Sequence, residues 1–131
     1  MYYQVSGTVN PNISYANRKR FRVYASKGII NRVLIGFPPG CFGLLRIQVY
    51  DKGWQILPFS HGESMGWDSY VYDVSLNYNL DSEPYELEVR AWNLDDTYEH
   101  SFFVGIEIKE ENIVASTDYT ELVNQLLGAK T

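Results

Sequence analysis

The apolar residues of this chain change their spacing near its end, and this change limits the folds open to it. From Tyr2 to Lys109 they mostly recur at every second position, the period of a β-strand with one buried face. After residue 118 they fall at i, i+3, i+4, i+7 and i+8, the stripe of an amphipathic helix: Tyr119, Leu122, Val123, Leu126 and Leu127. The sequence therefore predicts an all-β body followed by one short C-terminal helix.

Seven or eight strands follow from the alternation. They are joined by connections too short for crossover helices, and several of these carry the Gly, Pro, Asn and Asp of tight turns. The predicted strands cover residues 2–9, 20–25, 29–37, 44–50, 54–57, 70–76, 85–92 and 102–108. Strands joined in this way pair antiparallel, so we expect an antiparallel β-sandwich of jelly-roll or immunoglobulin-like type.

The segment 29–37 is apolar on both faces, which is typical of a central or covered strand. Its alternation predicts Ile29, Val33, Ile35 and Phe37 on one face and Ile30 and Leu34 on the other. This strand should therefore be central in a sheet or covered by another element.

The chain has the length and the 45% hydrophobic content of one folded unit. We expect residues 1–111 to form the sandwich and residues 112–131 to form a linker and a helical arm. Asp118 and Glu121 resemble a capping box, and Gly128 stands where a C-terminal cap is expected. An isolated helix this short is marginal in water, so it must dock either on its own sandwich or on a neighbouring chain.

Charge and cysteine content narrow the function classes. The net charge of −5 argues against a general nucleic-acid binder. No apolar run approaches the roughly 18 residues of a membrane span, and the first residues lack the pattern of a signal peptide. The single Cys41 lacks a neighbouring His or Lys, so we expect a small apolar filler near a turn.

The sequence shows no convincing catalytic or metal-binding constellation, and it predicts a protein without enzymatic activity, metal or cofactor. His61 and His100 stand outside the known catalytic motifs, and His100 is expected at the surface or an edge where a strand opens. Asn93, Asp95 and Asp96 could offer oxygens to calcium, but turn formation explains them more simply.

Two surface features predict contacts with partners. The first is a basic cluster of Arg18, Lys19, Arg20 and Arg22, interpreted as an electrostatic contact for which the acidic stretches 81–88 and 95–99 are natural partners. The second is the irregular segment 58–68. It carries Phe59, Met65 and Trp67, large apolar side chains that must be shielded from water by other residues.

Two non-enzymatic classes remain open. A carbohydrate-binding module would use exposed aromatic rings as a platform, and Trp54, Trp67 and Trp92 are its candidates. A structural subunit of an assembly would use the same aromatic abundance, including 11 tyrosines, for protein contacts. A detachable helix favours the second class.

The chain resembles small jelly-roll phage virion proteins, particularly capsid decoration or cementing proteins. The resemblance spans about residues 27–108 and is one of pattern. It is carried by residues 27–33 (KGIINRV), 37–40 (FPPG), 83–87 (EPYEL), 91–93 (AWN) and 96–98 (DTY).

The resemblance implies a non-enzymatic protein on the outside of a capsid, often a trimer, that stabilises the shell. Its expected partners are copies of itself and a major capsid protein, and its expected location is the virion, after synthesis in the host cytoplasm. We expect the docking face to be the helix residues Tyr119, Leu122, Val123, Leu126 and Leu127, with residues 2–9 as a second candidate arm. If these pack internally, Trp54, Trp67 or the tyrosine-bearing strand faces must form the interface.

Overall fold

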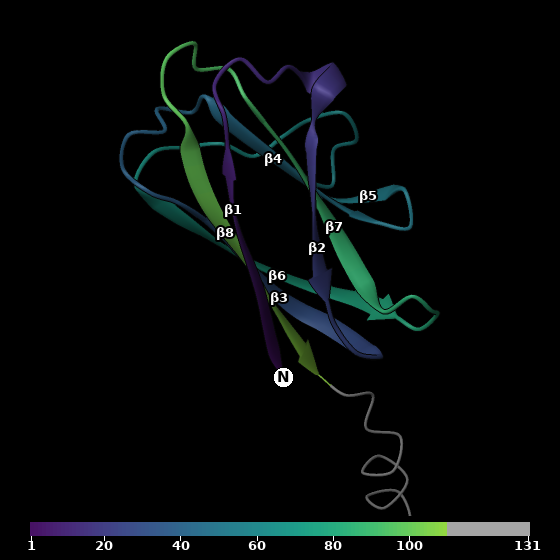
Figure 1. The fold of residues 1–131 in the computed structure, drawn as a ribbon. Coiled ribbons are helices and arrows are strands. Elements are labelled where there is room, and N and C mark those ends of the chain that lie inside the picture. The colour runs from purple at the N-terminus through teal and green to yellow at the C-terminus, as the bar shows by residue number, and fades with distance from the viewer. Residues whose placement is uncertain (110–131) are drawn as a thin grey trace, which may run out of the picture.

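The computed structural model describes residues 1–109, which form two four-stranded antiparallel sheets packed face to face (Figure 1). This confirms the predicted antiparallel β-sandwich. The elements in chain order are β1 (Tyr2–Val9), the 3-10 turn η1 (Tyr15–Asn17), β2 (Lys19–Tyr24), β3 (Gly28–Phe37), β4 (Leu45–Asp51), β5 (Trp54–Leu57), β6 (Tyr70–Leu80), β7 (Glu86–Asn93) and β8 (His100–Lys109). The predicted helical arm lies outside the described residues, among which no helix is long and apolar enough to cross a membrane.

The strand pairing is nested. The strand order is β1-β8-β3-β6 in one sheet and β2-β7-β4-β5 in the other. The first strand therefore pairs with the eighth, the second with the seventh, the third with the sixth and the fourth with the fifth. Every odd-numbered strand then ends at the same end of the sandwich. The β1–β2, β3–β4, β5–β6 and β7–β8 loops gather there, at the upper end of Figure 1, and we call this the loop end.

The core consists of the inward-facing side chains of both sheets, which are buried almost completely. Phe21 of β2 and Phe102 of β8 join the sheets through an edge-to-face contact with ring centroids 5.0 Å apart. Cys41 lies in the same core with 1% of its surface exposed, which confirms the predicted apolar filler. Burial raises the pKa of its thiol above the ordinary value.

β3 is the central strand that the sequence predicted, but its faces differ from the prediction. Its register shifts between Ile30 and Arg32 against both of its neighbours, β6 and β8. Such a bulge moves the alternation by one position. Ile30 is therefore fully buried, whereas Ile29 faces the other way and is only half-buried. The prediction that Ile29 shares a face with Val33 and Ile35 was wrong for this reason.

Candidate functional site

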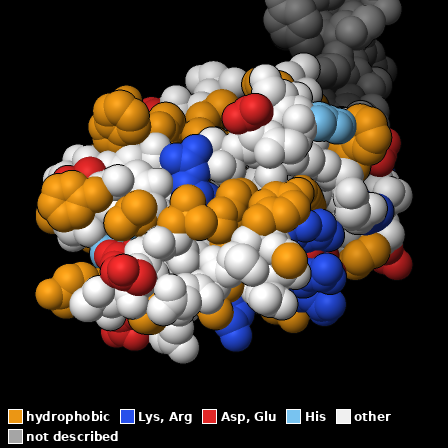
Figure 2. Space-filling model, turned by 90° about the horizontal axis from the view of Figure 1, so that it is seen from above, with side chains coloured by type: hydrophobic (Ala, Val, Ile, Leu, Met, Phe, Trp, Pro, Cys, Tyr) orange, Lys and Arg blue, Asp and Glu red, His pale blue; other side chains and the backbone are white. Residues whose placement is uncertain are grey.

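The loop end carries large apolar side chains that face solvent. All four loops contribute to this set, which we call the loop-end surface: Tyr15, Phe42, Phe59, Trp67, Leu94 and Tyr98. Phe42 is 76% exposed and Trp67 is 61% exposed. Figure 2 looks down on this end and shows hydrophobic side chains spread across it. Apolar groups gathered on one face are typical of an interaction site, whereas single exposed ones are ordinary.

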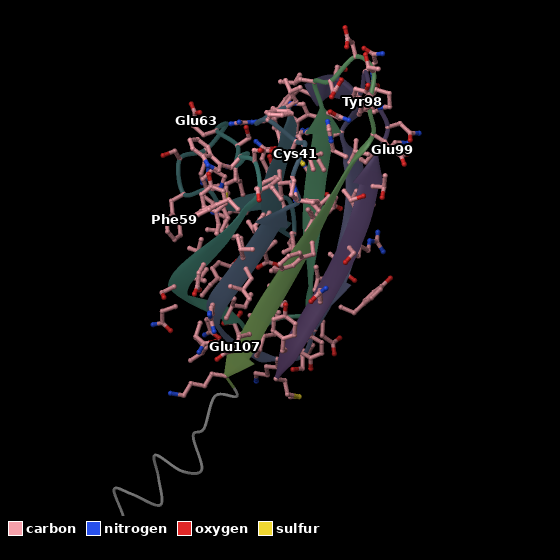
Figure 3. The ribbon with its side chains drawn as sticks, turned by 90° about the vertical axis from the view of Figure 1, so that its left-hand side faces the viewer. Cys41, Phe59, Glu63, Tyr98, Glu99 and Glu107 are labelled. Atoms are coloured by element: carbon pink, nitrogen blue, oxygen red, sulfur yellow. The ribbon has the colours of Figure 1, made fainter. Side chains whose placement is uncertain are left out.

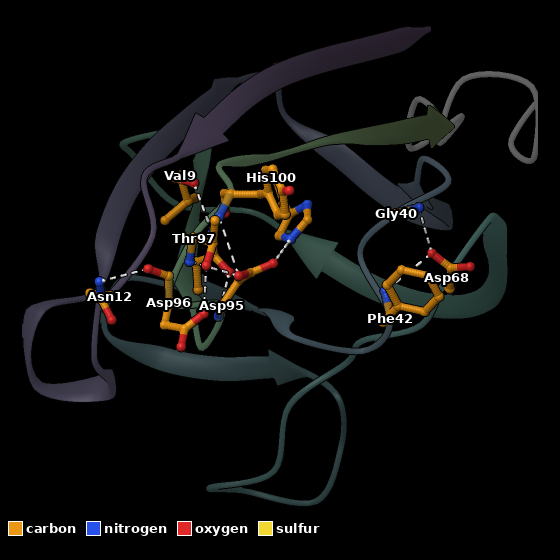
Figure 4. A network of polar contacts seen from close by, with 11 residues as sticks. Val9, Asn12, Gly40, Phe42, Asp68, Asp95, Asp96, Thr97 and His100 are labelled. Atoms are coloured by element: carbon orange, nitrogen blue, oxygen red, sulfur yellow. Dashed lines mark hydrogen bonds and ion pairs between the residues drawn. The ribbon is translucent and has the colours of Figure 1, made fainter.

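A shared acceptor holds two of these loops together. One carboxylate oxygen of Asp68 accepts the backbone N–H groups of Gly40 at 2.7 Å and Phe42 at 3.1 Å (Figure 4). The N–H of Gly43 in turn donates to the carbonyl oxygen of Trp67 at 3.2 Å. The β3–β4 and β5–β6 loops therefore form one frame, which positions the backbone that carries Phe42 and Trp67.

The β7–β8 loop is built around Asp95. Its Oδ1 accepts the N–H groups of Thr97 and Tyr98, and its Oδ2 lies 2.8 Å from Nε2 of His100 (Figure 4). The hydrogen bond from Thr97, followed by the one from His100, holds the pKa of Asp95 below its ordinary value. This loop therefore keeps Leu94 and Tyr98 in place.

Asn93 completes this turn. Its side-chain amide donates to the carbonyl oxygens of Val9 and Tyr98, and its Oδ1 accepts the N–H of Asp95. Asn93 and Asp95 thus make the turn contacts that the sequence favoured over calcium binding. Within residues 1–109, no three His, Cys, Asp or Glu side chains come together as a metal site would require.

His100 differs from the sequence expectation. It opens β8 as predicted, but it is 8% exposed instead of lying at the surface. Its contact with Asp95 provides the polar partner that a buried imidazole needs. His61, in contrast, is exposed, and its ring packs edge-on against Trp54 with centroids 4.5 Å apart.

Exposed carboxylates also lie at the loop end. Glu63, Asp96 and Glu99 are exposed there, and Figure 3 shows Glu63 and Glu99 at the end opposite Glu107. Arg46 reaches the same end but donates to Ser64 and to the carbonyl oxygen of Gly43. The described part of the loop end thus combines an apolar surface with exposed charges of both signs, since Lys19 is exposed there as well.

The predicted basic cluster finds partners within its own chain. Arg20 lies 3.8 Å from Glu88, and Arg22 lies 4.0 Å from Glu86. Both carboxylates belong to the acidic stretch that the sequence singled out. Lys19 is exposed at the start of β2. An electrostatic contact of this cluster with a partner stays a prediction.

Arg18 belongs to a network on the outer face of the second sheet. Its guanidinium lies 4.0 Å from the centroid of the Tyr15 ring and donates to Gln48 at 2.6 Å and to the Tyr50 hydroxyl at 3.1 Å. Gln48 is fully buried, although its position in β4 faces away from the core. The network therefore fixes η1, which carries Tyr15, against the sheet.

The structure separates the three tryptophans proposed for a carbohydrate platform. Trp54 and Trp67 are 63% and 61% exposed. Trp92 is 7% exposed, and Tyr15 packs edge-on against it with centroids 5.1 Å apart. Two of the three rings are therefore open to a ligand.

Sequence reasoning identified Phe59 and Trp67 but missed the other four members of the loop-end surface, of which Tyr15 lies in a connection described only as polar. Phe42, Leu94 and Tyr98 stand in predicted turns, and a large apolar residue in a turn was the signal that could have found them. The predicted docking residues of the helix, from Tyr119 to Leu127, lie outside the described residues. No protein-family model matches the chain, and no curated protein is significantly similar to it.

Proposed function

We propose that this chain is a non-enzymatic structural protein of a virus particle, a capsid decoration protein that binds the shell through its loop-end surface. The exposed rings of Phe42 and Trp67, held on one frame by Asp68, carry the proposal. Aromatic side chains in fixed positions are the usual anchors of protein interfaces. The pattern resemblance described above supplies the viral setting.

The nested strand order supports the jelly-roll form of the sandwich. Eight strands in two four-stranded sheets are the jelly-roll arrangement, whereas an immunoglobulin constant-type domain divides seven strands into sheets of four and three. The proposed partners are copies of this chain and a major capsid protein. The proposed location is the virion, with synthesis in the host cytoplasm.

The alternative is a carbohydrate-binding module, and the exposure of Trp54 and Trp67 favours it. Sugar rings stack on open aromatic faces, which both residues offer. Glycan-array binding that disappears in Trp67→Ala, together with no binding to particles, would establish the alternative.

The proposal is tested by rebinding. Particles of the virus that carries the gene are stripped of the chain, incubated with recombinant protein and sedimented. We expect the wild-type chain to sediment with the particles and Trp67→Ala or Phe42→Ala to lower its affinity about tenfold or more. Tyr24→Ala is the matched control, because Tyr24 is 68% exposed but lies away from the loop end. Equal losses for all three variants, or no binding of the wild-type chain, would refute docking by the loop end.

A further inference from the structure

The two sheets have four edge strands, and three of them carry features that discourage pairing with another chain. β5 has only four residues, and short edges offer little to pair with. β2 carries Lys19, Arg20 and Arg22, and charged side chains have the same effect. β6 contains a bulge, because its Leu76 and Asn77 stand opposite the single residue Asn31 of β3.

The fourth edge, β1, lacks all of these features. Its eight residues, YYQVSGTV, include no charge and no proline. Its register with β8 runs without a shift from Tyr2 opposite Glu107 to Val9 opposite His100. Among the described residues it pairs on this side alone. An uncharged edge of this length, without a bulge, is a template for another strand.

The inward side chains of β1 are also incompletely covered. Tyr3 and Val5 face the core but are half-buried, whereas Val9 at the end of the strand is fully buried. A strand added beside β1 would cover these side chains as well as pair the open backbone groups. The edge therefore offers both hydrogen bonds and apolar surface.

We propose that β1 pairs antiparallel with β1 of a second copy of this chain, joining the two sheets into one of eight strands. A two-fold axis through Val5 sets the two Val5 side chains opposite each other. On the same face, Tyr3 then stands opposite Gly7 of the other copy, so a large ring meets a residue without a side chain. On the outer face, Gln4 stands opposite Ser6 of the other copy.

The strand is thus complementary to itself in this register. β1 contains no charged residue, so pairing two copies of it brings no like charges together along the strand. On the neighbouring β2, Arg20 and Arg22 are paired with Glu88 and Glu86. Lys19 lies at the loop end, where β1 finishes, and the two-fold axis sets these ends of the two copies apart. The contact is closed by symmetry, as in most protein dimers.

This proposal is independent of the proposed function. It concerns one side of the first sheet, whereas docking on a shell uses the loop-end surface. A chain that fails to dimerise can still bind particles, and a chain that binds no particles can still dimerise. A negative result in one experiment therefore leaves the other proposal standing.

The first test is the solution mass of the full chain by light scattering over a range of concentrations. We expect a dimer, and we expect Gln4→Lys with Ser6→Lys to raise its dissociation constant at least about tenfold, because lysine on an edge opposes pairing. Both side chains are exposed, so the monomer fold is retained. Asn79→Lys, on the exposed outer side of β6, is the matched control and should leave the dimer intact. A chain that stays monomeric, or a dimer that survives the double substitution, would overturn the proposal.

The second test fixes the register. Gln4→Cys and Ser6→Cys chains are oxidised separately and as a mixture, while Cys41 stays buried in both. We expect disulfide-linked dimers mainly in the mixture, because residue 4 stands opposite residue 6. Equal linkage within each single variant would reject the axis at Val5. Hydrogen exchange gives a further check on the occupant of the edge. If the β1 amides are protected in a monomer, and this protection disappears when the chain is shortened to end at Glu111, the C-terminal segment covers the edge. That result would overturn the proposal.

Discussion

Nε2 of His100 lies 2.8 Å from Oδ2 of Asp95, and both side chains are buried beside the β7–β8 turn. The same carboxylate accepts the N–H groups of Thr97 and Tyr98. All three contacts favour the ionised carboxylate, so the pKa of Asp95 is lowered. One side chain thus couples the start of β8 to the loop that presents Leu94 and Tyr98.

This coupling predicts a loss of stability in acid. A carboxyl group whose pKa is depressed by folding stabilises the protein above its unfolded pKa, about 3.9 for Asp, and this contribution is lost as the pH falls through the folded value. We expect Asp95→Asn to be less stable than the wild-type chain at pH 7 and the difference to shrink towards pH 2. Urea unfolding at pH 7, 5, 3 and 2 measures it. Asp96→Asn, at an exposed position, is the control. A constant difference at all four pH values would contradict the role of Asp95.

Gly7 is expected to tolerate no side chain. A Cβ atom at this position would lie 2.6 Å from Cε1 of Phe21 and 2.9 Å from Cε1 of Phe102, two rings packed against each other in the core. Gly7→Ala should therefore lower the free energy of unfolding by about 1–3 kcal/mol, the usual cost of overpacking. The measurement is urea unfolding, with Ser6→Ala on the exposed side of the same strand as the control. Equal unfolding midpoints for the two variants would show that the rings move aside freely.

Local alternation was sufficient to predict most strands, because an inward apolar residue at every second position is a property of neighbouring residues. Local alternation was insufficient to predict the inward and outward faces of a strand where one residue interrupts the pattern. The bulge at Asn31 exchanges the roles of Ile29 and Ile30 without any sign in the composition of the segment. β6 continues to Leu80 beyond its predicted end, since Asn77 and Asn79 lie on its exposed face and resemble a connection.

The candidate site was harder to predict than the fold. Trp67 stood out because a large apolar residue in a loop needs an explanation. Phe42 and Leu94 belong to other loops, and only the nested pairing of distant strands brings these loops to one end. The burial of Gln48 has a similar origin, because its hydrogen-bond partners Arg18 and Glu63 come from the β1–β2 and β5–β6 loops. These relationships depend on long-range pairing, which the period of a sequence does not encode.

Removal of the Asp68 carboxylate should loosen the frame of the loop-end surface. Asp68→Ala leaves the N–H groups of Gly40 and Phe42 without their acceptor, at a cost of about 1–3 kcal/mol in the free energy of unfolding. Asp68→Asn keeps the accepting oxygen and should retain most of the stability. Urea unfolding and hydrogen exchange at the amides of Gly40 and Phe42 measure the effect. Unchanged exchange in Asp68→Ala would mean that other contacts hold these loops.

Arg18 is expected to be replaceable by neither alanine nor lysine. Its guanidinium lies over the Tyr15 ring while donating to Gln48 and Tyr50, and a lysine ammonium lacks the planar fork that makes these contacts together. Arg18→Ala should lower the free energy of unfolding by about 1–3 kcal/mol, since the buried Gln48 loses its charged donor. Arg18→Lys should recover only part of this loss. Lys19→Ala, an exposed neighbour, serves as the control for the removal of one positive charge, and urea unfolding compares the three variants. If Lys19→Ala costs as much as Arg18→Ala, the effect comes from net charge and not from the contacts between Arg18, the two tyrosines and Gln48.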